Sequence, residues 1–90
     1  MSRKEMVTRV IDGDTFMTGS RKNPVRLANV NTPEKKSRGA GAASQALRNL
    51  IQGQIVAIET VARDKYGRTV ASIRVGNRSV NAAMRREGYE

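Results

Sequence analysis

Hydrophobic and polar positions alternate with a period of two over the first third of the chain, as in strands with one buried face. This alternation predicts strands at residues 5–11, 15–18 and 25–30. The triplet Asp12, Gly13 and Asp14 separates the first two strands and favours a hairpin turn. A polar loop at residues 19–24 is expected before the third strand.

The period changes after a predicted loop at residues 31–41, which is rich in Lys, Arg and Gly. From residue 42 onward, apolar residues recur at the spacing of one helical face: Ala43, Ala46, Leu47, Leu50 and Ile51. Gly53 follows them at the place where a glycine commonly ends a helix. The pattern therefore predicts an amphipathic helix that ends before Gly53.

The last third of the chain predicts two strands and a short helix. Residues 54–61 are apolar and β-branched, which predicts a strand buried for much of its length. A turn at residues 64–67 and a strand at 68–75 follow, and Asn81 is expected to cap a helix at 82–87 that ends at Gly88. This order is that of a β-rich α+β fold, a five-stranded OB-fold barrel in one domain of residues 1–90.

Composition restricts the chemistry that this domain can perform. The chain contains no Cys and no His, which excludes thiolate and imidazole nucleophiles, bases and metal ligands. The oxygen ligands that remain favour a hard cation such as Ca²⁺ or Mg²⁺. The net charge of +9 indicates a polyanionic partner, most often nucleic acid.

The N-terminal segment gives an expectation about location. No apolar stretch follows its first six residues, Met-Ser-Arg-Lys-Glu-Met, so neither a signal peptide nor a membrane span is expected. The sequence therefore favours a cytoplasmic protein with no membrane partner.

Residues with catalytic potential gather at four places. They are residues 12–15 (Asp-Gly-Asp-Thr), Arg26, residues 31–34 (Asn-Thr-Pro-Glu) and residues 64–68 (Asp-Lys-Tyr-Gly-Arg). Taken singly, each is explained by a turn or by a solvent-facing strand residue. Taken together and in this order, they resemble the staphylococcal nuclease (thermonuclease) family. The matching pieces cover nearly the whole chain: VIDGDT at 10–15, VRLANVNTPE at 25–34, DKYGR at 64–68 and VNAAMRREG at 80–88.

The resemblance implies an OB-fold phosphodiesterase that hydrolyses DNA and RNA with Ca²⁺, favours single strands and leaves 3′-phosphates. It implies calcium ligation by Asp14, Asn31 and the Thr32 carbonyl, with Asp12 as an outer acid. It also implies that Arg26 and Arg68 grip the scissile phosphate and that Glu34 is the general base. Lys65 and Tyr66 match residues that hold a terminal phosphate.

The same chemistry follows from physical argument. Attack on a phosphodiester builds negative charge on its oxygens, which a divalent cation and two guanidinium forks neutralise. The attacking water must lose a proton, and in a chain without His a carboxylate is the ordinary base. Glu34 is expected on the same turn as Asn31, within reach of such a water.

Two departures from the family pattern lead to further expectations. Asn31 stands where the family has a second calcium carboxylate, so weaker metal binding is predicted, by roughly one to three orders of magnitude. The family domain also continues past the helix that ends at Gly88, with a further helix and with tyrosines of the base pocket. Exposed apolar surface is then expected, and with it either marginal stability or a homodimer.

Two other functions remain open on the sequence. A catalytically inactive OB-fold would bind nucleic acid through its charge alone, and such binding would weaken with salt and ignore Ca²⁺. A protein-interaction module would not bind nucleic acid at physiological salt.

Overall fold

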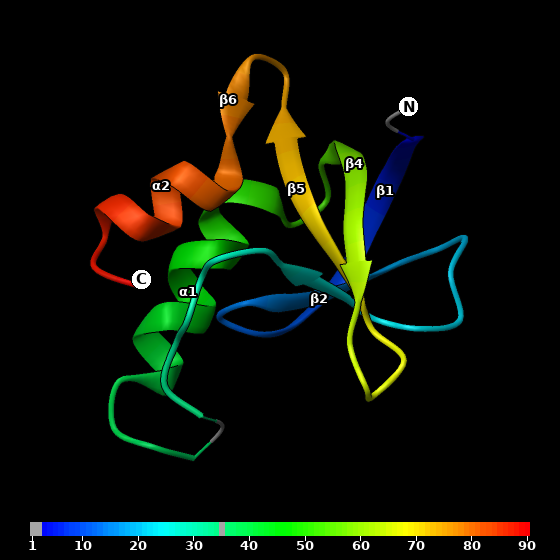
Figure 1. Cartoon of the computed structure of the whole chain (residues 1–90). Helices are drawn as coiled ribbons and strands as arrows, with labels where there is room; N and C mark the ends of the chain where they lie inside the picture. Colours follow the sequence, from blue (N-terminus) through cyan, green and yellow to red (C-terminus); the bar gives the residue numbers. More distant parts are fainter. Residues whose placement is uncertain (1–2, 35) are drawn as a thin grey trace.

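Six strands and two helices follow one another in the computed structural model, which describes residues 3–34 and 36–90 (Figure 1). The bounds of the first four elements are β1 (Arg3–Asp12), β2 (Thr15–Thr18), β3 (Val25–Leu27) and α1 (Ala40–Ile51). Those of the others are β4 (Ile55–Arg63), β5 (Thr69–Val75), β6 (Arg78–Ser79) and α2 (Val80–Arg86). Met1 and Ser2 of the predicted leaderless N-terminus, and Lys35 of the predicted loop, lie outside the described residues.

Five of the strands close into a ring, which confirms the OB-fold prediction. Around it β1 pairs with β2, β2 with β3, β3 with β5, β5 with β4, and β4 again with β1. Only the β3–β5 pair is parallel. The two-residue strand β6 pairs with β5 outside the ring and leads directly into α2.

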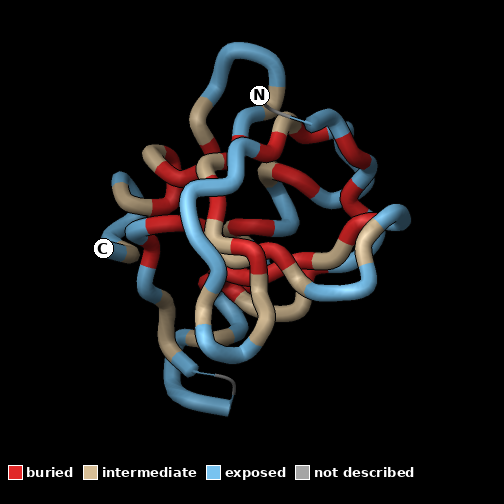
Figure 2. The backbone as a smooth tube through the Cα atoms, turned by 45° about the vertical axis from the view of Figure 1, so that its right-hand side comes forward, coloured by how far each residue is buried: buried red, intermediate tan, exposed pale blue. Residues whose placement is uncertain are grey.

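The core fills the ring and the space beneath the two helices. Figure 2 shows buried segments in the strands and in parts of both helices, while most loops and turns are exposed. Phe16, Leu27, Leu47, Ile73 and Met84 are among the largest fully buried side chains. Burying each such side chain contributes about 1.5–3 kcal/mol before conformational entropy is subtracted. The helix prediction is confirmed, although α1 begins two residues earlier than expected, at Ala40.

The third and fourth strands differ from their predictions. β3 ends at Leu27 rather than at residue 30, because Asn29 adopts a left-handed backbone with φ 58° and turns the chain. Beyond that turn the alternation no longer holds, and Val30 is buried. The predicted burial of the fourth strand is also wrong: β4 buries only Val56 and Ile58, and from residue 59 onward it is exposed. Past a register shift between Thr60 and Ala62, β4 continues with β5 as a ribbon away from the core.

The predicted cap of the last helix is wrong as well. Ser79 is the N-cap of α2, and its hydroxyl accepts a hydrogen bond from the Ala82 amide at 3.2 Å. Asn81 lies one turn inside, 4% exposed, and points toward the sheet. Both Ser and Asn are good N-caps, and packing against β5 chose between them. Within residues 3–34 and 36–90 no helix has the length and apolar character needed to cross a membrane.

Candidate active site

A surface cleft of about 310 Å³ gathers most of the residues that the sequence singles out. The β1–β2 turn, β3, the loop after β3 and the β4–β5 turn each contribute to it. Its lining residues are Asp12, Asp14, Arg26, Asn31, Thr32, Pro33, Glu34 and Arg68. Six of the eight predicted site residues therefore share one cleft, although they come from segments far apart in the sequence.

The β1–β2 turn holds Asp14 at the floor of the cleft. The Asp14 amide donates to the Asp12 carboxylate at 3.2 Å, and the Thr15 hydroxyl donates to Asp14 Oδ1 at 2.8 Å. Burial raises the pKa of Asp14 above its usual value and Asp12 raises it further, while Thr15 and the Arg26 guanidinium oppose the rise. The positive charge around Asp14 therefore compensates its desolvation only in part, and a cation there would favour the ionised form.

Gly13 fixes how closely this turn approaches its neighbours. A Cβ atom built on Gly13 would lie 2.6 Å from Ala43 Cβ and 2.9 Å from Thr32 Cγ2. Both distances are shorter than van der Waals contact, so only glycine fits between α1 and the loop after β3. The missing side chain thus brings Asp14 and Thr32 to the same side of the cleft.

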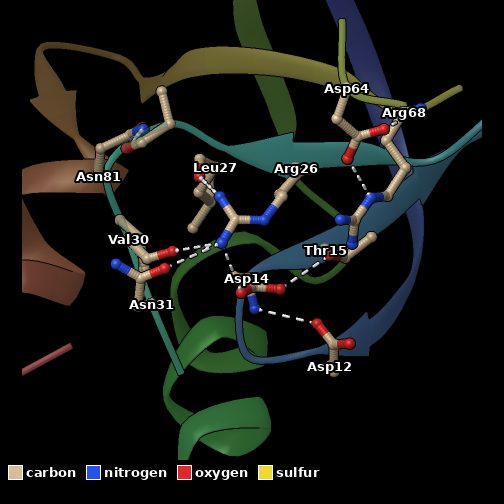
Figure 3. A network of polar contacts seen from close by, with 11 residues as sticks. Asp12, Asp14, Thr15, Arg26, Leu27, Val30, Asn31, Asp64, Arg68 and Asn81 are labelled. Carbon is tan, nitrogen blue, oxygen red and sulfur yellow. Dashed lines mark hydrogen bonds and ion pairs between the residues drawn. The ribbon is translucent and has the colours of Figure 1, made fainter. Parts of the chain in front are cut away.

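Arg26 lies at the centre of β3 and points out of the barrel, between the buried side chains of Val25 and Leu27. Its guanidinium donates to the carbonyls of Leu27 at 3.0 Å and Val30 at 3.1 Å. These two bonds fold the arginine over the loop that follows β3 and hold its outer edge at the cleft (Figure 3).

One nitrogen of Arg26 joins the two side chains expected to bind metal. Arg26 Nη2 lies 3.4 Å from Asp14 Oδ2 and donates to Asn31 Oδ1 at 3.2 Å. Both oxygens therefore point toward the same small region. A cation held there would share those oxygens with the guanidinium.

Arg68 reaches the cleft from the β4–β5 turn under the control of Asp64. Its Nε donates to Asp64 Oδ2 at 2.6 Å, while Asp64 Oδ1 accepts from the amides of Tyr66 at 3.0 Å and Arg68 at 2.9 Å. These contacts lower the pKa of Asp64, against the smaller influence of what desolvation it has. Figure 3 shows the Arg68 guanidinium turned toward the β1–β2 turn, on the same side of β3 as Arg26.

Asp64 is a residue that the sequence argument assigned only to a turn. Its position four residues before Arg68 is the available signal, because an Asp that caps a tight turn can also reach a side chain on the far side of that turn. Asp64 touches none of the cleft lining except Arg68, so it acts as a positioning residue.

Lys65 and Tyr66 do not line the cleft. They stand on the outer side of the same turn, where Tyr66 is 71% exposed. The Tyr66 ring has Lys65 Nζ at 5.3 Å and Arg68 Cζ at 5.5 Å from its centroid, within the range of cation–π attraction. The ring therefore connects Lys65 to the edge of the cleft through Arg68.

Glu34 and Thr32 lie in the loop after β3. Glu34 is exposed, and its carbonyl accepts from the Ser37 amide at 2.8 Å, which closes a turn beside the cleft. Asn81 supports the start of this loop from below, because its side-chain amide donates to the carbonyls of Ala28 at 2.9 Å and Ala71 at 3.1 Å. Asn81 is therefore a second supporting residue that the sequence argument placed elsewhere.

The donors at the cleft fit a hard cation. Asp14 offers a carboxylate, Asn31 an amide oxygen and Thr32 a backbone carbonyl, all of which Ca²⁺ accepts as ligands. No group of three or more His, Cys, Asp or Glu suited to a metal occurs among the described residues. A cation at this cleft would therefore depend on the amide and carbonyl oxygens as well as on Asp14.

Comparison with known proteins relates the chain to nucleases. Residues 24–90 match the family described as "Staphylococcal nuclease homologue". "Protein ParB" of Escherichia coli is 36% identical over 93 residues, which cover 91% of this chain and 52% of that protein. An "Uncharacterized endonuclease" of Escherichia coli O157:H7 is 33% identical over 85 residues, covering 91% of this chain and 56% of that protein.

A "Thermonuclease" of Staphylococcus intermedius is 34% identical over 93 residues, covering 92% of this chain and 55% of the relative. The chain thus spans about half the length of the curated relatives that it matches.

Proposed function

This chain belongs to the staphylococcal nuclease family, and from that premise we propose that it is a Ca²⁺-dependent nuclease acting on single-stranded DNA or RNA. The observation that carries the proposal is the single cleft in which Arg26, Arg68, Glu34 and Asp14 meet. Two guanidiniums and a solvent-accessible carboxylate beside a buried acid are the groups that hydrolysis of a phosphodiester needs. Hydrolysis of the 5′-side P–O bond yields a 3′-phosphate and a 5′-hydroxyl.

The two arginines bind the scissile phosphate. Both guanidiniums are held by acceptors behind them, Arg26 by carbonyls and Arg68 by Asp64, so little rotamer freedom is lost when a phosphate binds. Their planar forks match phosphate oxygens and stabilise the charge that grows there as water attacks phosphorus.

Glu34 takes the proton from the attacking water. It is exposed at the rim of the cleft and lies in the same loop as Asn31 and Thr32. Asp14, Asn31 and the Thr32 carbonyl are the residues that would hold Ca²⁺. When bound, this ion supplies positive charge beside the phosphate and beside the water.

The test is cleavage of a single-stranded oligonucleotide at millimolar Ca²⁺, compared with excess chelator. Glu34→Gln should lower the cleavage rate about 10²- to 10⁴-fold, the usual contribution of a general base, and leave oligonucleotide affinity nearly unchanged. Glu59→Gln, which removes an exposed carboxylate on β4, is the matched control and should cleave normally. Absence of cleavage by the unaltered chain across a wide Ca²⁺ range would reject the nuclease.

The contact between Asn31 and Arg26 favours a second candidate, nucleic-acid binding without cleavage. Arg26 already lies against Asn31 Oδ1 and Asp14, and with one carboxylate fewer than the family pattern the cleft attracts a cation less. Such a protein would bind single strands with equal affinity in Ca²⁺ and in chelator, and its affinity would fall steeply with salt.

A further inference from the structure

A second pocket, of about 160 Å³, lies beside the active-site cleft and shares no residue with it. The loop between β2 and β3 and the base of the β4–β5 hairpin form its walls. We call it the basic pocket, and its lining residues are Arg21, Lys22, Asn23, Arg63 and Thr69.

Arg21 is fixed in this pocket by a buried acid. Its Nε and Nη2 each lie 2.9 Å from the Glu5 carboxylate, and its Nη1 donates to the Thr69 hydroxyl at 3.3 Å. The Glu5 side chain is 3% exposed and that of Arg21 is 20% exposed. A guanidinium has five N–H groups and these contacts use three of them, so about two remain for a ligand.

The pocket carries a surplus of positive charge. Glu5 balances Arg21, but Lys22 and Arg63 are exposed and form no ion pair within residues 3–34 and 36–90. No acidic residue lines the pocket, whereas three carboxylates line the active-site cleft. The basic pocket therefore suits an anion, and it lacks the carboxylate base that hydrolysis requires.

The β4–β5 hairpin places the two sites side by side. Arg68 lines the cleft, and the next residue, Thr69, lines the basic pocket and pairs with Arg63 across the hairpin. The Thr69 amide also donates to the Pro24 carbonyl at 3.1 Å, which ties the β2–β3 loop to this hairpin. In Figure 1 the cyan loop between β2 and β3 returns to the barrel beside the yellow β4–β5 turn.

We propose that the basic pocket is a second phosphate site, which holds a phosphodiester of the same single strand whose scissile phosphate lies in the cleft. The proposal rests on the proposed function for the path of the strand. A strand gripped by Arg26 and Arg68 that continues past the β4–β5 turn reaches Arg63 and Lys22. The pocket binds backbone without reading bases, so it lengthens the binding site and favours longer strands.

The experiment compares the unaltered chain with Lys22→Ala/Arg63→Ala. Binding of oligothymidylates of about 3 and about 12 nucleotides is measured by fluorescence anisotropy in chelator, where nothing is cleaved; the longer strand lies within the usual OB-fold site size. The matched control is Arg48→Ala/Arg86→Ala, which removes two exposed cations from the helices. Thermal melting verifies that each variant is folded.

The variant should lose affinity for the long strand only. Two lost phosphate contacts lower the slope of log K against log salt by about 1.4 and weaken binding by about 20-fold at roughly 0.1 M salt. The short strand, which spans only the cleft, should keep its affinity in the variant. Equal losses for both lengths, or a loss no greater than that of the control, would overturn the basic pocket alone. If the unaltered chain binds neither strand at low salt, the proposed function fails with it.

Discussion

Arg26 is the residue at which phosphate binding and metal binding meet. Its Nη2 contacts both Asp14 and Asn31, so the charge of those two side chains decides how strongly the guanidinium is held and how much negative charge is left for a cation. With Asp at position 31 the region would carry one more negative charge, and Arg26 alone would not balance it. The amide of Asn31 therefore shifts this balance toward the arginine and away from a metal.

Restoring the carboxylate should restore cation affinity. Asn31→Asp is expected to raise Ca²⁺ affinity by about 10- to 1,000-fold, because ligand charge sets much of the affinity of a calcium site. Isothermal titration with Ca²⁺ measures the change independently of cleavage. Asn29→Asp is the control, since Asn29 is exposed, lies outside the cleft lining and has a left-handed φ of 58° that Asp tolerates. If both variants gain equally, the general charge of the loop explains the effect and Asn31 is not a ligand.

Asp64 acts on Arg68 through one oxygen and on the backbone through the other. Asp64→Asn keeps the oxygen that accepts from the Tyr66 and Arg68 amides, but it replaces the acceptor of Arg68 Nε with an amide group that cannot accept. We expect the cleavage rate to fall by about tenfold or more with little change in melting temperature, because a misplaced phosphate-binding group costs rate. Asp64→Ala should lower both. An unchanged rate in Asp64→Asn would remove Asp64 from the positioning of Arg68.

Two elements place the arginines by different means. β3 has three residues, enough to point Arg26 outward between two buried neighbours, and the turn at Asn29 then brings Asn31 back over it. The β4–β5 hairpin extends beyond the core as an exposed ribbon, and its turn delivers Arg68 to the cleft and Arg63 to the basic pocket. The exposure of β4 is therefore the consequence of a hairpin that contributes to both sites.

Helix α2 supports the cleft from behind through Asn81. Besides its two donated bonds, Asn81 accepts from the Ile73 amide at 2.8 Å, so one buried side chain ties α2 to β5 and to the residue after β3. Asn81→Ala should lower the free energy of unfolding by about 3 kcal/mol, since buried backbone groups lose their partners. Ser79→Ala, which removes the cap, should cost about 1 kcal/mol. Denaturant unfolding gives both values, and the reverse order would mean that Asn81 is the true cap.

At the scale of the whole molecule, the net charge of +9 coexists with a buried acid on the opposite face of β1 from solvent. Glu5 lies in the barrel wall, where burial opposes its ionisation, but hydrogen bonds from Arg21, Thr18 and Ser20 lower its pKa to about 2 from an ordinary 4.5. The network ties β1 to β2 and to the loop that lines the basic pocket. Its stability therefore depends on the charge of Glu5.

The pH dependence of unfolding tests this network. A depressed pKa contributes stability that is fully present above pH 4.5 and is lost as pH falls toward 2. We expect the free energy of unfolding to drop by about 3 kcal/mol more across that window in the unaltered chain than in Glu5→Gln. Glu59→Gln, an exposed control on β4, should keep the full dependence. Parallel curves for the unaltered chain and Glu5→Gln would contradict the assignment.

The sequence by itself determined the order of the elements, the ring of strands and the residues that could carry the chemistry. Period-two alternation located β1 and β2, helical spacing located α1, and turn residues such as Gly53 marked where elements end, because each signal depends only on near neighbours. The family pattern likewise gathered Arg26, Glu34 and Arg68 as a set before any geometry was known.

Only the tertiary structure decided which polar groups meet. The choice of Ser79 over Asn81 as cap, the end of β3 at Leu27 and the exposure of β4 all follow from packing between segments distant in sequence. The same holds for the second contact of Asp64 and for the placement of Arg21 beside Arg63. A local pattern reports which face of an element is apolar, but hydrogen bonds and charge balance depend on what lies across the fold, and closure of the barrel sets those neighbours.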